Sequence, residues 1–460
     1  MSLIKSISGI RGTIGGKVDE NLTPLDVVKF TSAFGTWLQN NKNKKDLTLV
    51  IGRDARISGS MVNSLVTATL QGLGIHVVDL GLSTTPTVEV MVPELNADGG
   101  IILTASHNPK QWNALKLLNE KGEFITGENG AEVLALAESQ DFNYAEVDDL
   151  GKYETRDDGF DIHIQKILDL PTVDVEAIKA KNFKVVLDAV NSTGGISIPP
   201  LLEKLGVEVV KLYCEPNGQF PHNPEPLKEH LGDICELVKK ENADMGIVVD
   251  PDVDRLALVD ENGEMFGEEY TLVAVADYLL KNRKGVAISN LSSSRALRDV
   301  AKKLDSEYFA SAVGEVNVVT LMKEKNAVIG GEGNGGIIYP ELHYGRDSLV
   351  GVALFLTHLA KENKTVSELR ATYPAYFMGK KKIELTPDID VDALLIKVQE
   401  EFKNEEISTV DGVKIDFDDN WVHLRKSNTE PIIRIYTEAF SQKEADDLGD
   451  KMIEKIKSLI

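Results

Sequence analysis

The feature that most restricts the fold of this chain is a pattern that occurs three times. An apolar segment with strand character runs into a polar loop rich in glycine and serine, and a helical segment follows, at residues 49–74, 185–206 and 286–304. Each time, a second apolar segment comes later in the same region. Strand, helix and parallel strand form a βαβ unit, whose sheet carries helices on its faces. The repeat therefore predicts an α/β protein with three similar domains and mixed, mainly parallel sheets.

The second apolar segment of each repeat ends in an unusual polar loop. These segments read GGIILTASHNP, MGIVVDPDVDR and NAVIGGEGNGG, at residues 99–109, 245–255 and 326–336. In open parallel sheets, ligands bind beyond the carboxyl ends of the strands. The three loops thus occupy equivalent edges of three domains, and we expect them to face one central cleft.

The last part of the chain follows a different pattern. From about residue 380, short apolar segments alternate with one helical segment, and an amphipathic helix closes the chain, which is typical of a smaller α+β domain. A chain of 460 residues is long enough for two to four domains of roughly 100 to 200 residues each. We therefore predict four domains, formed by residues 1–153, 154–256, 257–372 and 373–460.

Charge and composition exclude several classes of protein. The 50 lysines and arginines against 73 aspartates and glutamates give a net charge of -23, which argues against nucleic acid or an anionic membrane as a partner. No apolar run approaches the ~18 residues that span a bilayer, and the first residues lack a signal-peptide pattern, so a cytoplasmic protein is expected. Cys214 and Cys235 give no disulfide framework. A bound anion must therefore be held by a few local arginines and lysines.

Three aspartates, Asp250, Asp252 and Asp254, alternate along a tight loop between two apolar segments. Carboxylates this close repel one another unless a cation neutralises them, and oxygen ligands favour Mg²⁺ or Ca²⁺. The spacing also fits an EF-hand, but Arg255 stands where that loop needs glycine, and strands replace the flanking helices. The loop predicts a Mg²⁺ site, with a solvated turn as the alternative.

The glycine-rich loop at residues 331–336 matches the GxGxxG fingerprint of dinucleotide-binding proteins. That fingerprint has to open a helix, whereas here IIYPELHYG follows, with Pro340 in the way. Glycine lets the backbone approach a ligand closely, and Glu332 and Asn334, on either side of Gly333, can hydrogen-bond to hydroxyl groups. The loop suits a sugar, and a simple glycine turn is the alternative.

Two further segments carry candidate site residues. Residues 425–434 cluster two arginines with hydroxyl groups, an amide and turn N–H groups, which suits phosphate, although a surface salt-bridge turn explains the pattern equally well. Ser106 lies in LTASHNP, which has no glycine at either position required by the GxSxG nucleophile elbow. Taken by itself, Ser106 is an ordinary loop serine.

Together with GIRG at residues 9–12, these loops resemble the α-D-phosphohexomutase family, whose enzymes interconvert sugar 1-phosphates and 6-phosphates. The resemblance spans nearly the whole chain, and the motifs occur in the family's order. It implies that Ser106 is a phosphoserine that carries the phosphoryl group, and that Mg²⁺ is held by this group together with Asp250, Asp252 and Asp254. It also implies a sugar bisphosphate as the intermediate and activator.

The resemblance assigns the remaining residues as well. The sugar hydroxyls would be contacted by Glu332, Gly333 and Asn334, and the non-reacting phosphate would be held by Arg425, Ser427, Asn428, Thr429 and Arg434. The groups expected at the reaction centre besides Ser106 are Arg11, His107, Lys116 and Arg255. Lys116 matches the family lysine that assists proton transfer. Arg255 would neutralise phosphate oxygens, the main requirement of phosphoryl transfer.

Several positions depart from the family pattern. In many members the loop that corresponds to residues 331–336, the sugar loop, ends with GEMSGH or GEQSGH, whereas this chain has Asn334 in place of the serine and Gly336 in place of the histidine. The residue that acts as general acid or base therefore stays open, and His343 is a candidate substitute. Glu315 stands where hexose-type members often have histidine and glucosamine-type members aspartate. It favours glucosamine phosphate, with phosphomannomutase or phosphoglucomutase activity as the alternative. A metal-dependent sugar phosphatase and an inactive sugar-phosphate sensor are alternatives from other classes. The small-molecule partner is a phosphosugar, and a monomer or homodimer is expected.

Overall fold

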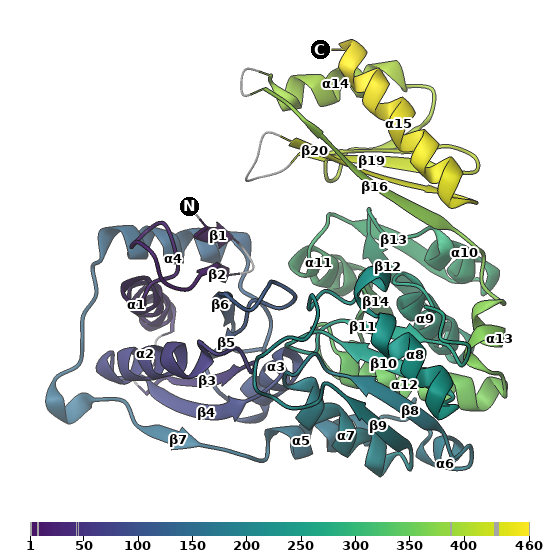
Figure 1. The fold of residues 1–460 in the computed structure, drawn as a ribbon. Helices are drawn as coiled ribbons and strands as arrows, with labels where there is room; N and C mark the ends of the chain where they lie inside the picture. The colour runs from purple at the N-terminus through teal and green to yellow at the C-terminus, as the bar shows by residue number, and fades with distance from the viewer. Residues whose placement is uncertain are drawn as a thin grey trace. The chain divides into compact units, whose positions relative to one another are not determined.

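The computed structural model describes residues 2–6, 9–42, 44, 46–386, 389–426 and 432–459 (Figure 1). These residues form two compact units. The first unit comprises residues 1–271 and 334–369, and the second comprises residues 272–333 and 370–460. Within the part of the chain that is described, no helix is both long and apolar enough to cross a membrane.

The first unit begins with a seven-stranded sheet. Its strands are β1 (Ile4–Ser6), β2 (Gly9–Thr13), β3 (Thr48–Arg53), β4 (His76–Leu82), β5 (Gly99–Leu103), β6 (Trp112–Leu118) and β7 (Tyr153–Thr155). Their order is β1-β2-β6-β5-β3-β4-β7. Strands β5, β3, β4 and β7 pair in parallel, whereas β1, β2 and β6 pair antiparallel with their neighbours.

Four helices accompany this sheet, namely α1 (Pro24–Asn41), α2 (Gly59–Gly72), α3 (Thr85–Glu94) and α4 (Gly127–Ser139). Helix α1 begins with a capping box, in which Thr23 and Asp26 satisfy each other's backbone N–H groups, and Pro24 opens its first turn. Its Phe30 and Phe34 are fully buried in a core shared with strand β3. Burial of this apolar face is what stabilises the helix.

A second, four-stranded sheet completes this part of the first unit. It contains β8 (Lys184–Asp188), β9 (Glu208–Leu212), β10 (Met245–Val249) and β11 (Leu256–Val259), with helices α5 (Gly159–Leu168), α6 (Val175–Lys179), α7 (Gly194–Lys204) and α8 (Gly232–Glu241). The order is β11-β10-β8-β9, with β8 parallel to both neighbours and β10 antiparallel to β11. Every residue of β10 and β11 is buried, which explains their continuous apolar sequences.

Residues 334–369 also belong to the first unit. They form β15 (Gly336–Ile338), α12 (Ser348–Glu362) and most of α13 (Val366–Arg370). Asp347 caps α12, because its Oδ1 accepts hydrogen bonds from the N–H groups of Leu349 at 2.8 Å and Val350 at 3.3 Å. Residues 348–360 are all buried, and α12 contacts α5, α6 and α7. This helix is therefore an internal element of the first unit.

The second unit contains another strand and helix repeat. Its elements are β12 (Val286–Asn290), α10 (Ala296–Lys303), β13 (Glu307–Ser311), α11 (Glu315–Lys325) and β14 (Ile329–Glu332), preceded by α9 (Tyr270–Asn282). Strand β12 lies between β13 and β14 and pairs in parallel with both. Helix α11 contacts β12, β13 and β14, and α10 contacts β12 and β13.

The chain ends in a five-stranded antiparallel sheet with two helices. The elements are β16 (Phe377–Glu384), α14 (Val391–Glu401), β17 (Glu406–Ser408), β18 (Val413–Asp416), β19 (Trp421–Lys426), β20 (Ile432–Ala439) and α15 (Gln442–Leu459). The order is β16-β20-β19-β18-β17. Ile433, Ile435 and Leu424 share a buried core with residues of α14 and α15. Because side chains alternate along a strand, the residues between them project from the other face of the sheet.

The predicted α/β architecture is confirmed, with three sheets that contain parallel strands and a C-terminal α+β domain. In each repeat, the strand that ends in the unusual loop pairs in parallel with the first strand of the repeat, as β5 does with β3, β10 with β8 and β14 with β12. The short strand β17 was not anticipated, because its three residues carry no clear alternation.

Candidate active site

Ser106 lies in the loop that follows strand β5, and only 8% of its surface is exposed. Its backbone adopts a left-handed conformation, with φ at 49°, which is uncommon for a residue other than glycine. The backbone N–H donates to Thr104 Oγ1 at 2.9 Å, and Ser106 Oγ donates to Asp250 Oδ2 at 2.8 Å. The sharp turn thus directs the serine hydroxyl to the aspartate loop. This contact agrees with the expected convergence of the serine loop and the aspartate loop.

Arg56 holds the serine loop in this conformation, and sequence analysis did not single it out. Its guanidinium donates to the backbone oxygens of Ser106, Asn108, Pro109 and Trp112 and pairs with Asp54 at 2.9 Å. The side chains of Asp54 and Arg56 are both fully buried. The available signal was GRDAR at the carboxyl end of β3, because this strand lies beside β5.

Replacing Arg56 by methionine is expected to lower the free energy of unfolding by about 3–5 kcal/mol, because Asp54 would remain buried without its partner. Urea-induced unfolding measures the effect. The matched control is Arg298→Met, whose side chain is 40% exposed, and which should change stability by no more than about 0.5 kcal/mol. Equal unfolding midpoints for the two variants would show that the buried pair does not stabilise the serine loop.

Asp250, Asp252 and Asp254 lie between β10 and β11 and are completely buried. One carboxylate oxygen from each lies within 4.8 Å of the others. Asp250 Oδ1 accepts from the N–H groups of Asp254 and Arg255, each at 3.1 Å. Oδ1 of Asp252 and Oδ1 of Asp254 are buried and have no hydrogen-bond partner among the described residues. Orphaned buried carboxylate oxygens fit a hard cation such as Mg²⁺.

Two cations balance part of this negative charge. Lys116 Nζ lies 2.7 Å from Asp252 Oδ2 and 3.5 Å from Asp254 Oδ2, and Arg346 Nη2 donates to Asp254 Oδ2 at 2.7 Å. Three carboxylates outnumber these two cationic side chains, so the site can take up further positive charge. Arg346 was not predicted from the sequence.

The pKa values of the site reflect the same balance. Burial, followed by the charges of Asp254 and Asp252, raises the pKa of Asp250 well above its usual value. Burial acts in the same direction on Asp252, but the Lys116 ammonium outweighs it and lowers the pKa of Asp252. Burial alone would lower the pKa of Lys116, whereas the charges of Asp252 and Asp254 raise it. Lys116 is therefore an ammonium ion in this arrangement.

The remaining candidates for the reaction centre are also in the first unit. His107 Nδ1 lies 3.4 Å from Ser106 Oγ, and burial and then the charge of Arg255 lower its pKa to about 2, so the imidazole is neutral. Arg11 on β2 is in register with Ala114 on β6, so it projects from the same face of the sheet as Lys116. The Arg255 side chain lies 3.5 Å from Glu225 Oε1.

The glycine-rich loop at residues 331–336 is divided between the two units, and each part has its own contacts. In the second unit, Glu332 Oε1 accepts from Asn290 Nδ2 at 2.9 Å and from Gly314 N–H at 3.1 Å, and Gly333 N–H donates to Ser293. Glu315 follows Gly314 directly, opens helix α11 and is 8% exposed. The hydrogen bond to Gly314 therefore links Glu332 to the segment that carries Glu315.

In the first unit, the loop continues with Asn334, whose Oδ1 accepts from the N–H group of Gly336 at 3.2 Å. A Cβ atom at Gly336 would lie 2.3 Å from Cδ of Arg346. The stem of Arg346 thus fills the space where a side chain at position 336 would begin. This packing explains how the chain accommodates glycine where many members have histidine.

His343 takes part in a different cluster. Its Nδ1 lies 3.4 Å from Glu89 Oε2, and its Nε2 lies 3.3 Å from Asp347 Oδ2. Both ring nitrogens therefore face carboxylates outside the aspartate triad. The geometry gives no support to His343 as the substitute for the family histidine.

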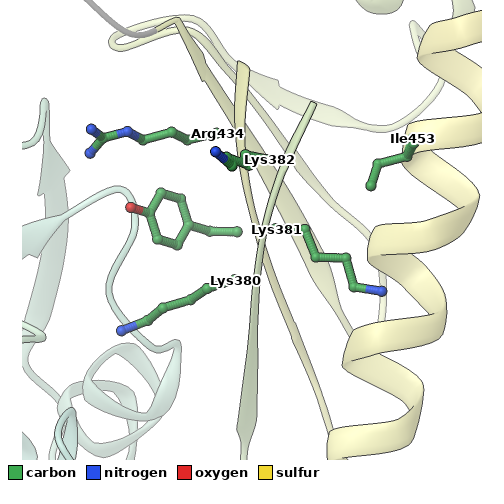
Figure 2. A pocket seen from close by; sticks show the side chains of 6 residues that line it. Lys380, Lys381, Lys382, Arg434 and Ile453 are labelled. Atoms are coloured by element: carbon green, nitrogen blue, oxygen red, sulfur yellow. The ribbon is translucent and has the colours of Figure 1, made fainter. Parts of the chain in front are cut away.

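Cationic side chains gather on the face of the last sheet that is opposite its core. Cross-strand register places Arg425 beside Arg434 and Arg434 beside Lys382, and Tyr436 lies between His423 and Lys380 in the next row. Figure 2 shows Arg434 and Lys380 projecting from one side of the sheet, while Lys381 points to the side of helix α15. An open pocket of ≈ 520 Å³ is lined by Lys380, Lys381, Lys382, Arg434, Tyr436 and Ile453.

The predicted phosphate residues are only partly described. Ser427, Asn428 and Thr429 lie outside the described residues. Arg425 Nε donates to Asp411 Oδ2 at 2.8 Å, and the N–H group of Val313 donates to the same oxygen at 2.9 Å. Asp411 thus orients one arginine of the cationic face and links it to the segment before Glu315. Asp411 was not predicted from the sequence, because it lies in no recognisable motif.

Comparison with known protein families covers nearly the whole chain. Residues 3–144, 161–263 and 267–376 match α/β/α domains I, II and III of phosphoglucomutase/phosphomannomutase, and residues 378–455 match its C-terminal domain. The four matches occur in the order in which the family carries these domains.

Individual relatives agree with the family match. A phosphoglucomutase/phosphomannomutase of Thermococcus kodakarensis is 39% identical over 96% of this chain and 98% of its own. A phosphoglucosamine/phosphogalactosamine mutase of Sulfurisphaera tokodaii is 33% identical over 98% of each chain. Among solved structures, a phosphoglucomutase/phosphomannomutase family protein of Burkholderia thailandensis superimposes with a TM-score of 0.85 at 25% identity and covers 99% of this chain and 98% of its own. The chain therefore belongs to the phosphoglucomutase/phosphomannomutase family and is a phosphohexomutase, an isomerase that moves phosphate within a hexose phosphate.

Proposed function

We propose that the protein converts glucosamine 6-phosphate to glucosamine 1-phosphate through a phosphoserine at Ser106. The observation that carries the proposal is the 2.8 Å hydrogen bond from Ser106 Oγ to Asp250, beside two buried carboxylate oxygens of Asp252 and Asp254 that have no partner among the described residues. A phosphoryl group on Ser106 needs positioning and charge neutralisation more than an activated nucleophile. Mg²⁺ held by the three aspartates would supply that neutralisation.

The reaction runs through two phosphoryl transfers. In the first, the bond between phosphorus and Ser106 Oγ breaks, the phosphoryl group bonds to O1 of the sugar, and the hydroxyl proton of O1 is released. The resulting sugar 1,6-bisphosphate reorients in the site. In the second transfer the phosphoryl group on O6 returns to Ser106 Oγ, and O6 takes up a proton. The enzyme ends as it began, phosphorylated, and the product is the 1-phosphate.

The charged groups around Ser106 have distinct tasks in this scheme. Lys116, as an ammonium ion beside Asp252, can give a proton to the sugar oxygen that leaves phosphorus. Arg11 and Arg255 would bind the phosphoryl oxygens, and Arg346 holds Asp254 in place. His107, which is neutral, can accept or donate one hydrogen bond next to Ser106.

At the other end of the substrate, the non-reacting phosphate would be bound by Arg425 and Arg434 together with Ser427, Asn428 and Thr429. Because the sugar binds in both orientations during one cycle, this clamp has to accept the phosphate on O6 and the phosphate on O1 in turn. The neighbouring Lys382 adds positive charge to the same face of the sheet. Local charge thus overcomes the net charge of -23.

Preference for an amino sugar rests on acidic groups near the sugar loop. Glu315 and Glu332 are both buried, and they are connected through Gly314. A carboxylate suits the ammonium group at C2 of glucosamine better than the hydroxyl group of mannose or glucose. The Sulfurisphaera tokodaii relative is named for amino-sugar phosphates, whereas the more similar Thermococcus kodakarensis relative is named for glucose and mannose phosphates.

Steady-state rates on glucosamine 6-phosphate, mannose 6-phosphate and glucose 6-phosphate, with Mg²⁺ and a trace of sugar bisphosphate, test this assignment. The proposal expects the highest kcat/KM for glucosamine 6-phosphate, and Glu315→Gln should lower it for that sugar alone. A higher kcat/KM for mannose or glucose phosphate contradicts the glucosamine assignment and supports the phosphomannomutase or phosphoglucomutase alternative.

The same assays address the remaining alternatives. Steady release of inorganic phosphate without isomerised sugar would identify a phosphatase, and binding without any turnover would identify a sensor. A cytoplasmic location and a monomeric or homodimeric state remain predictions, and light scattering of the purified protein measures the latter.

Asp411→Asn is expected to raise KM by roughly 10-fold or more, because a hydrogen bond to a charged group contributes about 1.5–3 kcal/mol. The variant keeps the shape of the side chain but removes the charge that orients Arg425. Little change in kcat is expected, since the clamp binds ground state and transition state alike. The exposed Asp419→Asn is the matched control. Unchanged KM in Asp411→Asn would show that this contact does not position the clamp.

A further inference from the structure

A second group of buried metal-ligating side chains lies in the first unit, outside the aspartate triad. It consists of His163, His343 and Asp347. His163 and Asp347 are fully buried, and the His343 side chain is 7% exposed. These residues come from helix α5, from the segment after β15 and from the cap of α12. The mutase scheme assigns no role to any of them.

The spacing of the donor atoms suits a single divalent ion. Asp347 Oδ2 lies 3.0 Å from His163 Nε2 and 3.3 Å from His343 Nε2, and one ligand atom from each of the three residues lies within 4.8 Å of the other two. Ligands of a tetrahedral Zn²⁺, about 2.0–2.2 Å from the metal, are separated by about 3.3 Å. The two imidazole rings meet edge to face, with an interplanar angle of 84°. Both Nε2 atoms lie close to the same oxygen of Asp347.

The outer nitrogen of each ring faces an oxygen atom, within hydrogen-bond distance for His163 and at ion-pair distance for His343. His163 Nδ1 lies 3.0 Å from Thr87 Oγ1, and His343 Nδ1 lies 3.4 Å from Glu89 Oε2. Histidine ligands commonly donate their second N–H group to a carboxylate or another oxygen, which fixes the tautomer that presents Nε2 to the metal. The carboxylates of Asp347 and Glu89 would together carry two negative charges, which balance the two positive charges of one divalent cation.

The cluster also joins elements that support the aspartate triad. Thr87 and Glu89 lie on helix α3, whose Thr85 donates through Oγ1 to Asp252 Oδ2 at 2.6 Å. Arg346, which precedes Asp347, donates to Asp254. An ion at the cluster would therefore connect α3, α5 and the cap of α12.

We propose that His163, His343 and Asp347 form a second metal site of the transition-metal class, best suited to Zn²⁺, distinct from the Mg²⁺ site of the mutase reaction. Imidazole nitrogens select this class over Mg²⁺, which prefers oxygen ligands only. Three protein ligands leave one position of a tetrahedral ion for water. The role of the site is structural, because the cluster is buried and joins residues of α3, α5 and the cap of α12.

The test uses the full-length protein, stripped with a chelator and then dialysed against Zn²⁺ in millimolar Mg²⁺, so that Mg²⁺ occupies the aspartate triad. Elemental analysis is expected to find one Zn²⁺ retained per chain, and Co²⁺ in its place should give the strong visible absorption of a tetrahedral ion. Zn²⁺ should also raise the melting temperature. Absence of retained Zn²⁺ in the wild-type protein would overturn the proposal.

Variants then locate the ion. His343→Gln and His163→Gln should each weaken Zn²⁺ binding by at least about 100-fold and abolish the rise in melting temperature. Asp252→Asn and the matched control His230→Gln, a half-buried histidine outside the cluster, should retain the full equivalent. Circular dichroism of the metal-free variants verifies their folding. Zn²⁺ that is retained equally by both glutamine variants, or that is lost in Asp252→Asn, places the ion elsewhere and refutes the site.

Discussion

If Ser106 carries the phosphoryl group as proposed, Ser106→Ala is expected to lower kcat for sugar-phosphate isomerisation by about 10⁴-fold or more, because the substitution would eliminate the reaction route rather than one contact. Oγ is the only atom of the Ser106 side chain that can carry the phosphoryl group, and it lies 2.8 Å from Asp250 Oδ2. Alanine removes one buried hydrogen bond but no packing of consequence. Coupled assays of glucosamine 1-phosphate formation measure the loss.

The matched control is Ser64→Ala, on the exposed face of helix α2, which should retain wild-type kcat and KM. The alanine variant at position 106 should still bind glucosamine 6-phosphate, since the sugar loop and the phosphate clamp are unchanged. Turnover within 10-fold of the wild-type rate in Ser106→Ala would exclude the phosphoserine route.

The second large effect is expected for Asp252→Asn. Its Oδ1 is buried without a partner among the described residues, and its Oδ2 accepts from Lys116 and Thr85. Loss of one charge from the triad should weaken Mg²⁺ binding. It should also lower kcat by about 10³-fold, because a metal ion supplies several kcal/mol of charge stabilisation in the transition state. Activity measured across a range of Mg²⁺ concentrations shows both effects.

Removal of the metal from the wild-type enzyme should reproduce this loss reversibly. A chelator is expected to abolish turnover, and added Mg²⁺ should restore it. Asp148→Asn, on the exposed surface, serves as the charge control and should behave like the wild type. Full activity of Asp252→Asn at low Mg²⁺ concentration would contradict the assignment of the triad as the metal site.

The sequence was sufficient to predict the α/β fold because the strand and helix periodicities are repeated three times. The parallel pairing of β5 with β3, β10 with β8 and β14 with β12 follows from the βαβ rule, and it brings each unusual loop to the carboxyl edge of its sheet. The same rule, together with the family's motifs, accounts for the contact between Ser106 and Asp250.

The residues that support the site were not predictable in this way. Arg56 acts through backbone carbonyl groups of the serine loop, and such contacts leave no pattern in the sequence of the loop itself. Arg346 reaches Asp254 from a position 92 residues away in the chain, and its stem fills the space next to Gly336. These contacts depend on tertiary packing, so short-range periodicity contains no information about them.

For His343, by contrast, the sequence suggested a role that the structure does not support. Its position shortly after the sugar loop suggested a replacement for the missing family histidine. A separation of seven residues along the chain, however, says little about direction in space, because β15 and the following turn intervene. The ring instead lies between Glu89 and Asp347, in the proposed second metal site.

In the proposed reaction, Ser106 carries the phosphoryl group between enzyme and sugar. The most direct measurement incubates the dephosphorylated protein with labelled glucosamine 1,6-bisphosphate and Mg²⁺, locates the label by peptide mass spectrometry, and then chases it with unlabelled glucosamine 6-phosphate in a rapid-quench experiment. We expect one label per chain on Ser106 that passes to the sugar at least as fast as kcat. Label on another residue, or label on Ser106 that stays there or leaves only as inorganic phosphate, would contradict the account.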